Sequence, residues 1–182
     1  MNLLLPKTFV DLQPTNLPLF FLAGPIKGGD NWQATCSEML TERLPSCTIA
    51  SPRHYTQTHR LFQYKITGEE DMFERQTDWE RFYLYRAALD GCIIFWLPRE
   101  SLTEPRTDGS PYARDTYGEL GEWRGHLQHY RNLRVAIGAE ADFPGLSVLT
   151  RNFKLALGQD YPIYTSLEET IAAAINFATA IK

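Results

Sequence analysis

Short apolar runs alternate with longer segments in which apolar residues recur at helical spacing. The runs at Leu19–Ala23 and Cys92–Leu97 are continuous and end at Gly24-Pro25 and Pro98. This is typical of strands that are buried on both faces of a sheet. Shorter runs predict three further strands, at Cys47–Ala50, Val135–Gly138 and Tyr161–Tyr164.

Four segments with helical spacing of apolar residues lie between or after these strands. The first begins near Asp30 and extends toward Pro45, and the second runs from Glu69 to Leu89. The third begins at Asp115 or Thr116 and extends to Tyr130, and the fourth follows a capping Ser166 and extends to Phe177. Strands that alternate with helices favour an α/β fold with a parallel sheet. We therefore expect one domain over residues 1–182, a flavodoxin-like or Rossmann-like open parallel sheet of about five strands with helices on both faces.

Composition and charge narrow the class of protein. The chain of 182 residues is 43% hydrophobic and carries a net charge of -4. This argues against a nucleic-acid polymer as partner, because such partners require a basic surface. Three widely spaced cysteines predict buried, reduced thiols. Without a convincing signal peptide or an apolar stretch of about 20 residues, we expect a cytoplasmic protein and no membrane span.

Three segments are expected to converge beyond the carboxyl ends of the strands, where ligands bind in open parallel sheets. The first is the loop 23–29, whose glycines would let backbone N–H groups approach a sugar or phosphate; a plain turn before a helix explains it equally well. The second is Asp90, with Asp78 and Glu80 on the preceding helix. The alternative for these acids is a helix-to-strand turn and solvated helix charges.

The third segment is 115–123, which contains Glu119 and Glu122. We expect Glu119 in the first helical turn, where the helix dipole stabilises an ionised carboxylate. Such an anion can act as a nucleophile toward a developing oxocarbenium ion. The alternative is that both residues are ordinary first-turn acids. His126 and His129 lack a metal-binding signature, and we expect neither a metal nor a cofactor.

Together these segments resemble the nucleoside 2-deoxyribosyltransferase family, and more closely its deoxyribosyltransferase-like branch. The resemblance covers about Leu19 to Trp123. It rests on the opening strand and Gly-Pro loop at 20–26, Asn31-Trp32-Gln33, the helix motif at 76–80, the Asp-led strand at 90–98, and Gly118-Glu119-Leu120-Gly121.

The resemblance implies that Glu119 attacks C1' of a nucleoside, forms a covalent glycosyl-enzyme and passes the 2-deoxyribosyl group to a second nucleobase. Asp90 is the first candidate for contact with the base, followed by Asp78 and Asp115. The partners implied are a nucleoside or nucleotide, a free nucleobase, and further copies of this chain in a homo-oligomer whose pocket a neighbour completes. The substrate-binding residues implied are Phe21, Ala23, Gly24, Pro25, Ile26, Lys27, Trp32, Asp115, Gly118, Glu122 and Asn152.

Two alternatives stay open. The related deoxynucleoside 5'-monophosphate N-glycosidases share the Glu-Leu-Gly motif, and Lys27-Gly28-Gly29 could receive a 5'-phosphate. The well-studied transferases have Tyr and Asp where this chain has Phe20 and Ala113. That difference leaves room for a nucleotide-binding sensor module without turnover.

Overall fold

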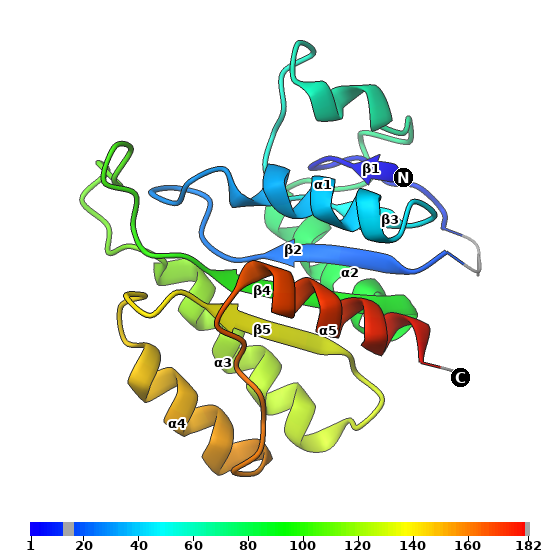
Figure 1. Cartoon of the computed structure of the whole chain (residues 1–182). Coiled ribbons are helices and arrows are strands. Elements are labelled where there is room, and N and C mark those ends of the chain that lie inside the picture. The colour runs from blue at the N-terminus through cyan, green and yellow to red at the C-terminus, as the bar shows by residue number, and fades with distance from the viewer. Residues whose placement is uncertain (13–16, 181–182) are drawn as a thin grey trace.

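The fold is built on one parallel sheet, seen in a computed structural model that describes residues 1–12 and 17–180. Its five strands lie in the order β1-β3-β2-β4-β5, and every neighbouring pair is parallel (Figure 1). The strands are β1 (Asn2–Leu4), β2 (Leu19–Ala23), β3 (Thr48–Ala50), β4 (Gly91–Leu97) and β5 (Val135–Ala139).

Helices cover both faces of this sheet. In Figure 1, α1 and α5 lie in front of the strands and α2 and α3 lie behind them, with α4 packed beside α3. This confirms the predicted flavodoxin-like open α/β sheet. The helices are α1 (Trp32–Arg43), the 3-10 helix η1 (Arg60–Tyr64), α2 (Gln76–Asp90), α3 (Arg114–His129), α4 (Leu146–Leu157) and α5 (Leu167–Thr179).

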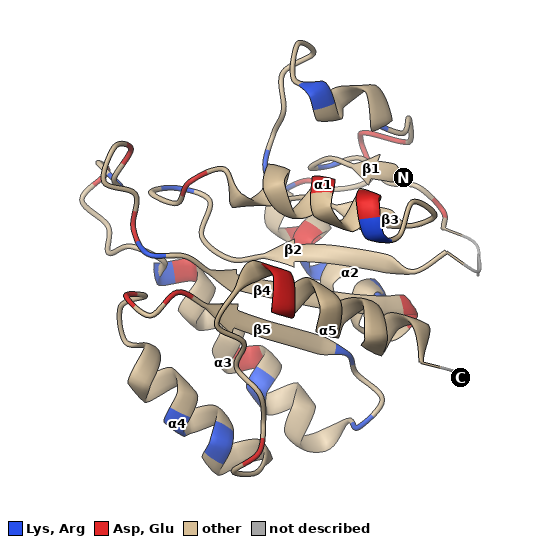
Figure 2. Cartoon of the chain, viewed as in Figure 1, with Lys and Arg blue, Asp and Glu red and all other residues tan. Residues whose placement is uncertain are grey.

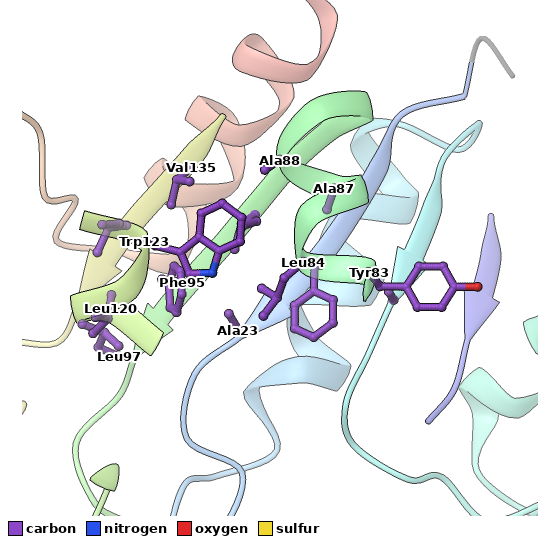
Figure 3. Close-up of a cluster of buried hydrophobic side chains, with 14 of the residues drawn as sticks. Ala23, Tyr83, Leu84, Ala87, Ala88, Phe95, Leu97, Leu120, Trp123 and Val135 are labelled. Atoms are coloured by element: carbon purple, nitrogen blue, oxygen red, sulfur yellow. The ribbon is translucent and has the colours of Figure 1, made fainter. Parts of the chain in front are cut away.

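Alternate residues of each strand feed two separate hydrophobic cores. Phe95 packs on the side of α2 and α3, near the fully buried Trp123 (Figure 3). Phe21 and the fully buried Trp79 belong to the same core. Phe20 and its neighbours on the other strand face pack against α1 and α5. Burial on both faces explains why the central strands are continuous apolar runs rather than alternating ones.

One predicted strand is wrong and one strand was not predicted. Residues 161–164 join β5 only through Tyr164, whose N–H donates to the Ile137 carbonyl and whose carbonyl accepts from Ala139 N–H. Pro162 has no N–H with which to extend the pairing. The fifth strand is instead Asn2–Leu4, which pairs with β3.

Helix boundaries also differ from expectation. The backbone of Glu69 exchanges two hydrogen bonds with Phe9, at 2.7 and 2.9 Å, so the second helix begins at Gln76 and not at Glu69. The next helix begins at Arg114, before the predicted caps, and α4 was not predicted. The predicted cap of the last helix is confirmed, because Ser166 Oγ accepts a hydrogen bond from Glu169 N–H at 3.2 Å.

The three cysteines are free and buried, as predicted. Burial raises the pKa of each thiol, most strongly for Cys36 and Cys92. Among residues 1–12 and 17–180, no helix combines the length and the apolar character needed to cross a bilayer.

Candidate functional site

A cavity of about 510 Å³ opens where β2 and β4 end. The chain turns from β2 toward β3 on one side, and β4 lies on the other side, so the cavity occupies the switch point of the sheet. Strand β2, the loops that follow β2, β3 and β4, and helices α2 and α3 all contribute to it. Its lining comprises Phe21, Ala23, Gly24, Pro25, Ile26, Lys27, Pro52, His54, Gln76, Glu80, Arg106, Asp108, Ser110, Ala113, Arg114, Asp115, Thr116 and Glu119.

The loop after β2 is held in place by close contacts with β4 and α1. Gly24 has a φ of 143°, and a Cβ at this position would collide with the carbonyl oxygen of Trp96 on β4. Only glycine fits such a close approach at this φ. The Trp32 indole N–H donates to the Pro25 carbonyl at 3.0 Å, and Trp32 is buried. Trp32 was expected to contact the substrate. It instead supports the loop from behind and does not line the cavity.

Two carboxyl groups from neighbouring helices meet in this cavity. Glu80 comes from α2 and Glu119 from α3. Glu80 accepts a hydrogen bond from the Gln76 side-chain amide at 2.7 Å. Within the described part of the chain, no group donates a hydrogen bond to the carboxyl of Glu119, which leaves that group available to a ligand.

Burial perturbs both carboxyl groups in the same direction. It raises the pKa of Glu119 to about 8, and the charges of Glu80, Asp115 and Glu122 add to the effect. Burial also raises the pKa of Glu80, although the Gln76 hydrogen bond opposes the shift. Two interacting carboxyl groups with raised pKa values hold a proton near neutral pH, which is the condition needed for acid and base catalysis.

The expectation that Glu119 lies in the first helical turn is wrong. Because α3 begins at Arg114, Asp115 occupies the first turn and Glu119 lies one turn further along. The helix dipole acts mainly within the first turn, so it does not offset the burial of Glu119. Burial therefore favours the protonated form of Glu119 near neutral pH.

The expected convergence of Asp90 and Asp78 with Glu119 is also wrong. Asp90 directly precedes β4, so it lies roughly 20 Å from the end of the strand where the cavity opens. Its carboxylate accepts from Arg86 Nε at 2.8 Å. Asp78 accepts from the backbone N–H of Arg75 at 3.1 Å and thereby caps α2. Neither residue lines the cavity. The carboxyl group that lies there with Glu119 belongs to Glu80.

Three other predicted residues also lie outside the cavity lining. Gly118 is exposed on α3. Glu122 forms a two-point ion pair with Arg81, at 2.9 and 3.2 Å. Asn152 lies in a separate groove between α3 and α4. The remaining predicted residues line the cavity, namely Phe21, Ala23, Gly24, Pro25, Ile26, Lys27, Asp115 and Glu119.

Sequence reasoning missed much of the lining that the two long loops supply. His54 contacts Gln76 at 3.2 Å, and Arg106 forms a two-point ion pair with Asp108, at 2.6 and 3.1 Å. The Arg106 side chain is only 9% exposed. The length of the loops 51–68 and 99–114 was the available signal, because long loops in compact domains are often functional.

A second cavity of about 340 Å³ adjoins the first and shares Ile26, Lys27, Arg106 and Asp108 with it. It adds Arg53 and the backbone of Gly28 and Gly29. One Arg53 guanidinium nitrogen, Nη1, is buried without a hydrogen-bond partner in the described structure. Basic and acidic positions alternate along the loops that follow β2 and β4 (Figure 2). Glu104 and Asp108 line this cavity as well, and Asp108 pairs with both Lys27 and Arg106, which partly neutralises its basic groups.

The site is suited to acid–base and nucleophilic chemistry by carboxyl groups. Within residues 1–12 and 17–180, no group of three or more His, Cys, Asp or Glu side chains is placed to hold a metal ion. In comparisons with known proteins, no protein-family model and no curated protein matches this chain.

Proposed function

We propose that the protein cleaves the N-glycosidic bond of a nucleoside and transfers the 2-deoxyribosyl group to another nucleobase. The observation that carries this proposal is the meeting of Glu80 and Glu119, from different helices, in one cavity at the switch point of the sheet. Each carboxyl has a raised pKa. Pairs of carboxyl groups in such settings divide the roles of nucleophile and acid in glycoside cleavage.

In the proposed first step, Glu119 attacks C1' while the C1'–N bond breaks. The bonding electron pair leaves with the base, and Glu80 donates a proton to the base. The products are a free nucleobase and a glycosyl ester of Glu119. In the second step, a nitrogen of another base attacks C1', its proton passes to Glu80, and the ester electrons return to Glu119. The proton and both carboxyl groups are then restored.

The protonation states fit these roles once substrate binds. The two carboxyl groups influence each other's titration, so they are best described as a pair that shares a proton. Positive charge that develops at C1' stabilises an ionised Glu119 and leaves the proton on Glu80. Gly24 of the loop after β2 and the side chain of Phe21 would contact the sugar and base.

Incubation with a deoxynucleoside and a second free base tests the proposal. We expect chromatography to show an exchanged nucleoside, and Glu119→Gln to abolish it. Glu42→Gln, at an exposed position on α1, is the matched control and should keep full activity. The absence of both exchange and base release over a panel of nucleosides would refute the proposal. Ligand binding without turnover, equal in Glu119→Gln, would identify a sensor module instead.

Mass spectrometry of the acid-quenched reaction tests the covalent step directly. We expect the peptide that contains Glu119 to gain the mass of one deoxyribosyl group. A label on another residue would reassign the nucleophile, whereas free sugar without a labelled peptide would indicate direct attack by water.

The adjoining cavity, with its three basic side chains, favours a second candidate, hydrolysis of a deoxynucleoside 5'-monophosphate. Lys27, Arg53 and Arg106 surround the backbone of Gly28 and Gly29 there, and the unpaired Arg53 nitrogen is suited to an anion. If the substrate is a monophosphate, Lys27→Ala and Arg53→Ala should raise its KM about tenfold, the effect of losing one charge-assisted contact. The KM for the unphosphorylated nucleoside should stay within twofold.

We assign the proposed reaction to the cytoplasm. The three buried, free thiols suit a reducing compartment. Fractionation of the source cells, with immunodetection of the chain, tests this assignment.

A further inference from the structure

A third cavity, of about 150 Å³, lies between α2 and α3. Thr77, Arg81, Leu84 and Tyr85 of α2 line it, together with Glu122 and Trp123 of α3. Among the described residues, only Glu80 and Glu119 line both this cavity and the large one. The carboxyl pair therefore separates the two spaces and faces each of them.

The size and lining of this cavity suit water. A water molecule occupies about 30 Å³ in the liquid, so the cavity has room for about five, and it is smaller than the roughly 300 Å³ of a typical ligand pocket. Buried Leu84 and Trp123 form its apolar wall. Thr77, Arg81 and the carboxyl groups offer the hydrogen-bond partners that an enclosed water needs.

A polar network connects the cavity to bulk solvent. Arg81 pairs with Glu122 at 2.9 Å, and its side chain is 61% exposed. The His126 ring contacts Glu122 at 3.5 Å and the Tyr85 hydroxyl at 2.7 Å. Because Thr77 and Arg81 are exposed, the rim of this cavity lies at the protein surface, where it can take up water.

We propose that the cavity between α2 and α3 supplies water to Glu80, which activates this water to hydrolyse the glycosyl-enzyme once the released base has moved away from C1'. This inference rests on the proposed function. A water oxygen bonds to C1', and its proton passes to the Glu80 carboxylate. The ester bond to Glu119 breaks, and its electron pair returns to the Glu119 carboxylate. The cavity thus sets the balance between hydrolysis and transfer.

A variant that closes the opening tests the route. Thr77 is exposed at the rim, so Thr77→Trp adds bulk there without disturbing the core. With a nucleoside and no acceptor base, we expect the first release of base to stay within twofold of the parent protein. The steady-state release of free sugar should fall about tenfold, and the glycosyl-enzyme should accumulate in mass spectra. Leu89→Trp, at an exposed position on α2 that does not line this cavity, is the control and should change neither rate.

Two results would overturn the inference while leaving the proposed function intact. One is an active parent protein in which Thr77→Trp releases free sugar as fast as the parent does, or in which both rates fall together. The other is a high-resolution crystal structure without ordered water between Glu80, Glu119 and Glu122. A parent protein that releases no base from any nucleoside would refute the proposed function, and the water route with it.

Discussion

At the scale of single residues, the carboxyl group of Glu119 makes the proposed activity depend on pH. Glu119 must lose its proton to act as a nucleophile, and its pKa is raised to about 8 by burial and by the acids around it. Below this value, each pH unit reduces the ionised fraction about tenfold. We therefore expect kcat/KM to rise about tenfold from pH 6 to 7 and to fall again at higher pH, where Glu80 loses the proton that it must donate to the base.

Asp115→Asn tests the cause of this shift. Asp115 lines the cavity and its negative charge raises the pKa values of both Glu119 and Glu80. Its removal should move the rising limb of the kcat/KM profile toward lower pH. Asp160→Asn, at an exposed position outside the cavity lining, should leave the profile in place. An unshifted limb in Asp115→Asn would show that another group controls the pH dependence.

The same carboxyl affects the stability of the fold. Because the folded pKa of Glu119 lies above the ordinary value for glutamate, the folded chain binds more protons than the unfolded chain between about pH 4.5 and 8. The stabilisation present below this window is lost as the pH rises through it. Glu119→Gln cannot ionise, so its melting temperature should exceed that of the parent increasingly from pH 5 to 9, by about 3 °C for each kcal/mol regained. Glu42→Gln should follow the parent curve, and a constant offset in Glu119→Gln would contradict the assignment.

At the scale of elements, the strands with long apolar runs were predictable and the short or irregular elements were not. Leu19–Ala23 is buried on both faces, so its composition alone marks it as a strand. Asn2–Leu4 has only three residues, too few to show a period. The helix Leu146–Leu157 is an exception, because it was predictable but was not predicted. Its apolar residues recur at helical spacing and pack on the core, namely Leu146, Leu149, Phe153 and Leu157.

The turn from β2 into its loop gives a prediction about backbone geometry. A side chain at position 24 would press against the Trp96 carbonyl on β4 and occupy an unfavourable φ. We expect Gly24→Ala to cost roughly 1–3 kcal/mol and to weaken ligand binding, because the loop lines the large cavity. Gly118→Ala has open space around it within α3 and should instead gain about 0.5–1 kcal/mol. Urea unfolding of both variants tests this, and equal effects would contradict it.

At the scale of the whole molecule, the sequence predicts which residues reach the carboxyl edge of the sheet directly after a strand. It does not predict which side chains of α2 and of the long loops join them there. Gly24 and Glu119 follow strands and line the same cavity, because the carboxyl ends of parallel strands share one edge. Asp90 precedes its strand and therefore lies at the opposite edge. Glu80 resembled a solvated helix charge, and only the packing of α2 beside the cavity brings it to Glu119. Arg106 belongs to an aperiodic loop, whose return to the cavity no local pattern reports.

The outer surface beside α4 gives the last prediction, which concerns assembly. Val148 and Leu155 are 62% and 65% exposed, and the adjoining groove of about 450 Å³ between α3 and α4 contains Asn152. Gly121 leaves this part of α3 open to close approach. We expect a second copy of the chain to cover this surface, because a twofold axis can bury the same apolar patch on both copies at once.

Val148→Glu with Leu155→Glu should then convert the assembly to monomers in sedimentation experiments, since each places a charge in the contact. Leu102→Glu, at a position that is 85% exposed on the loop after β4, should leave the assembly intact. A parent chain that sediments as a monomer at every concentration would contradict this prediction without touching the carboxyl pair.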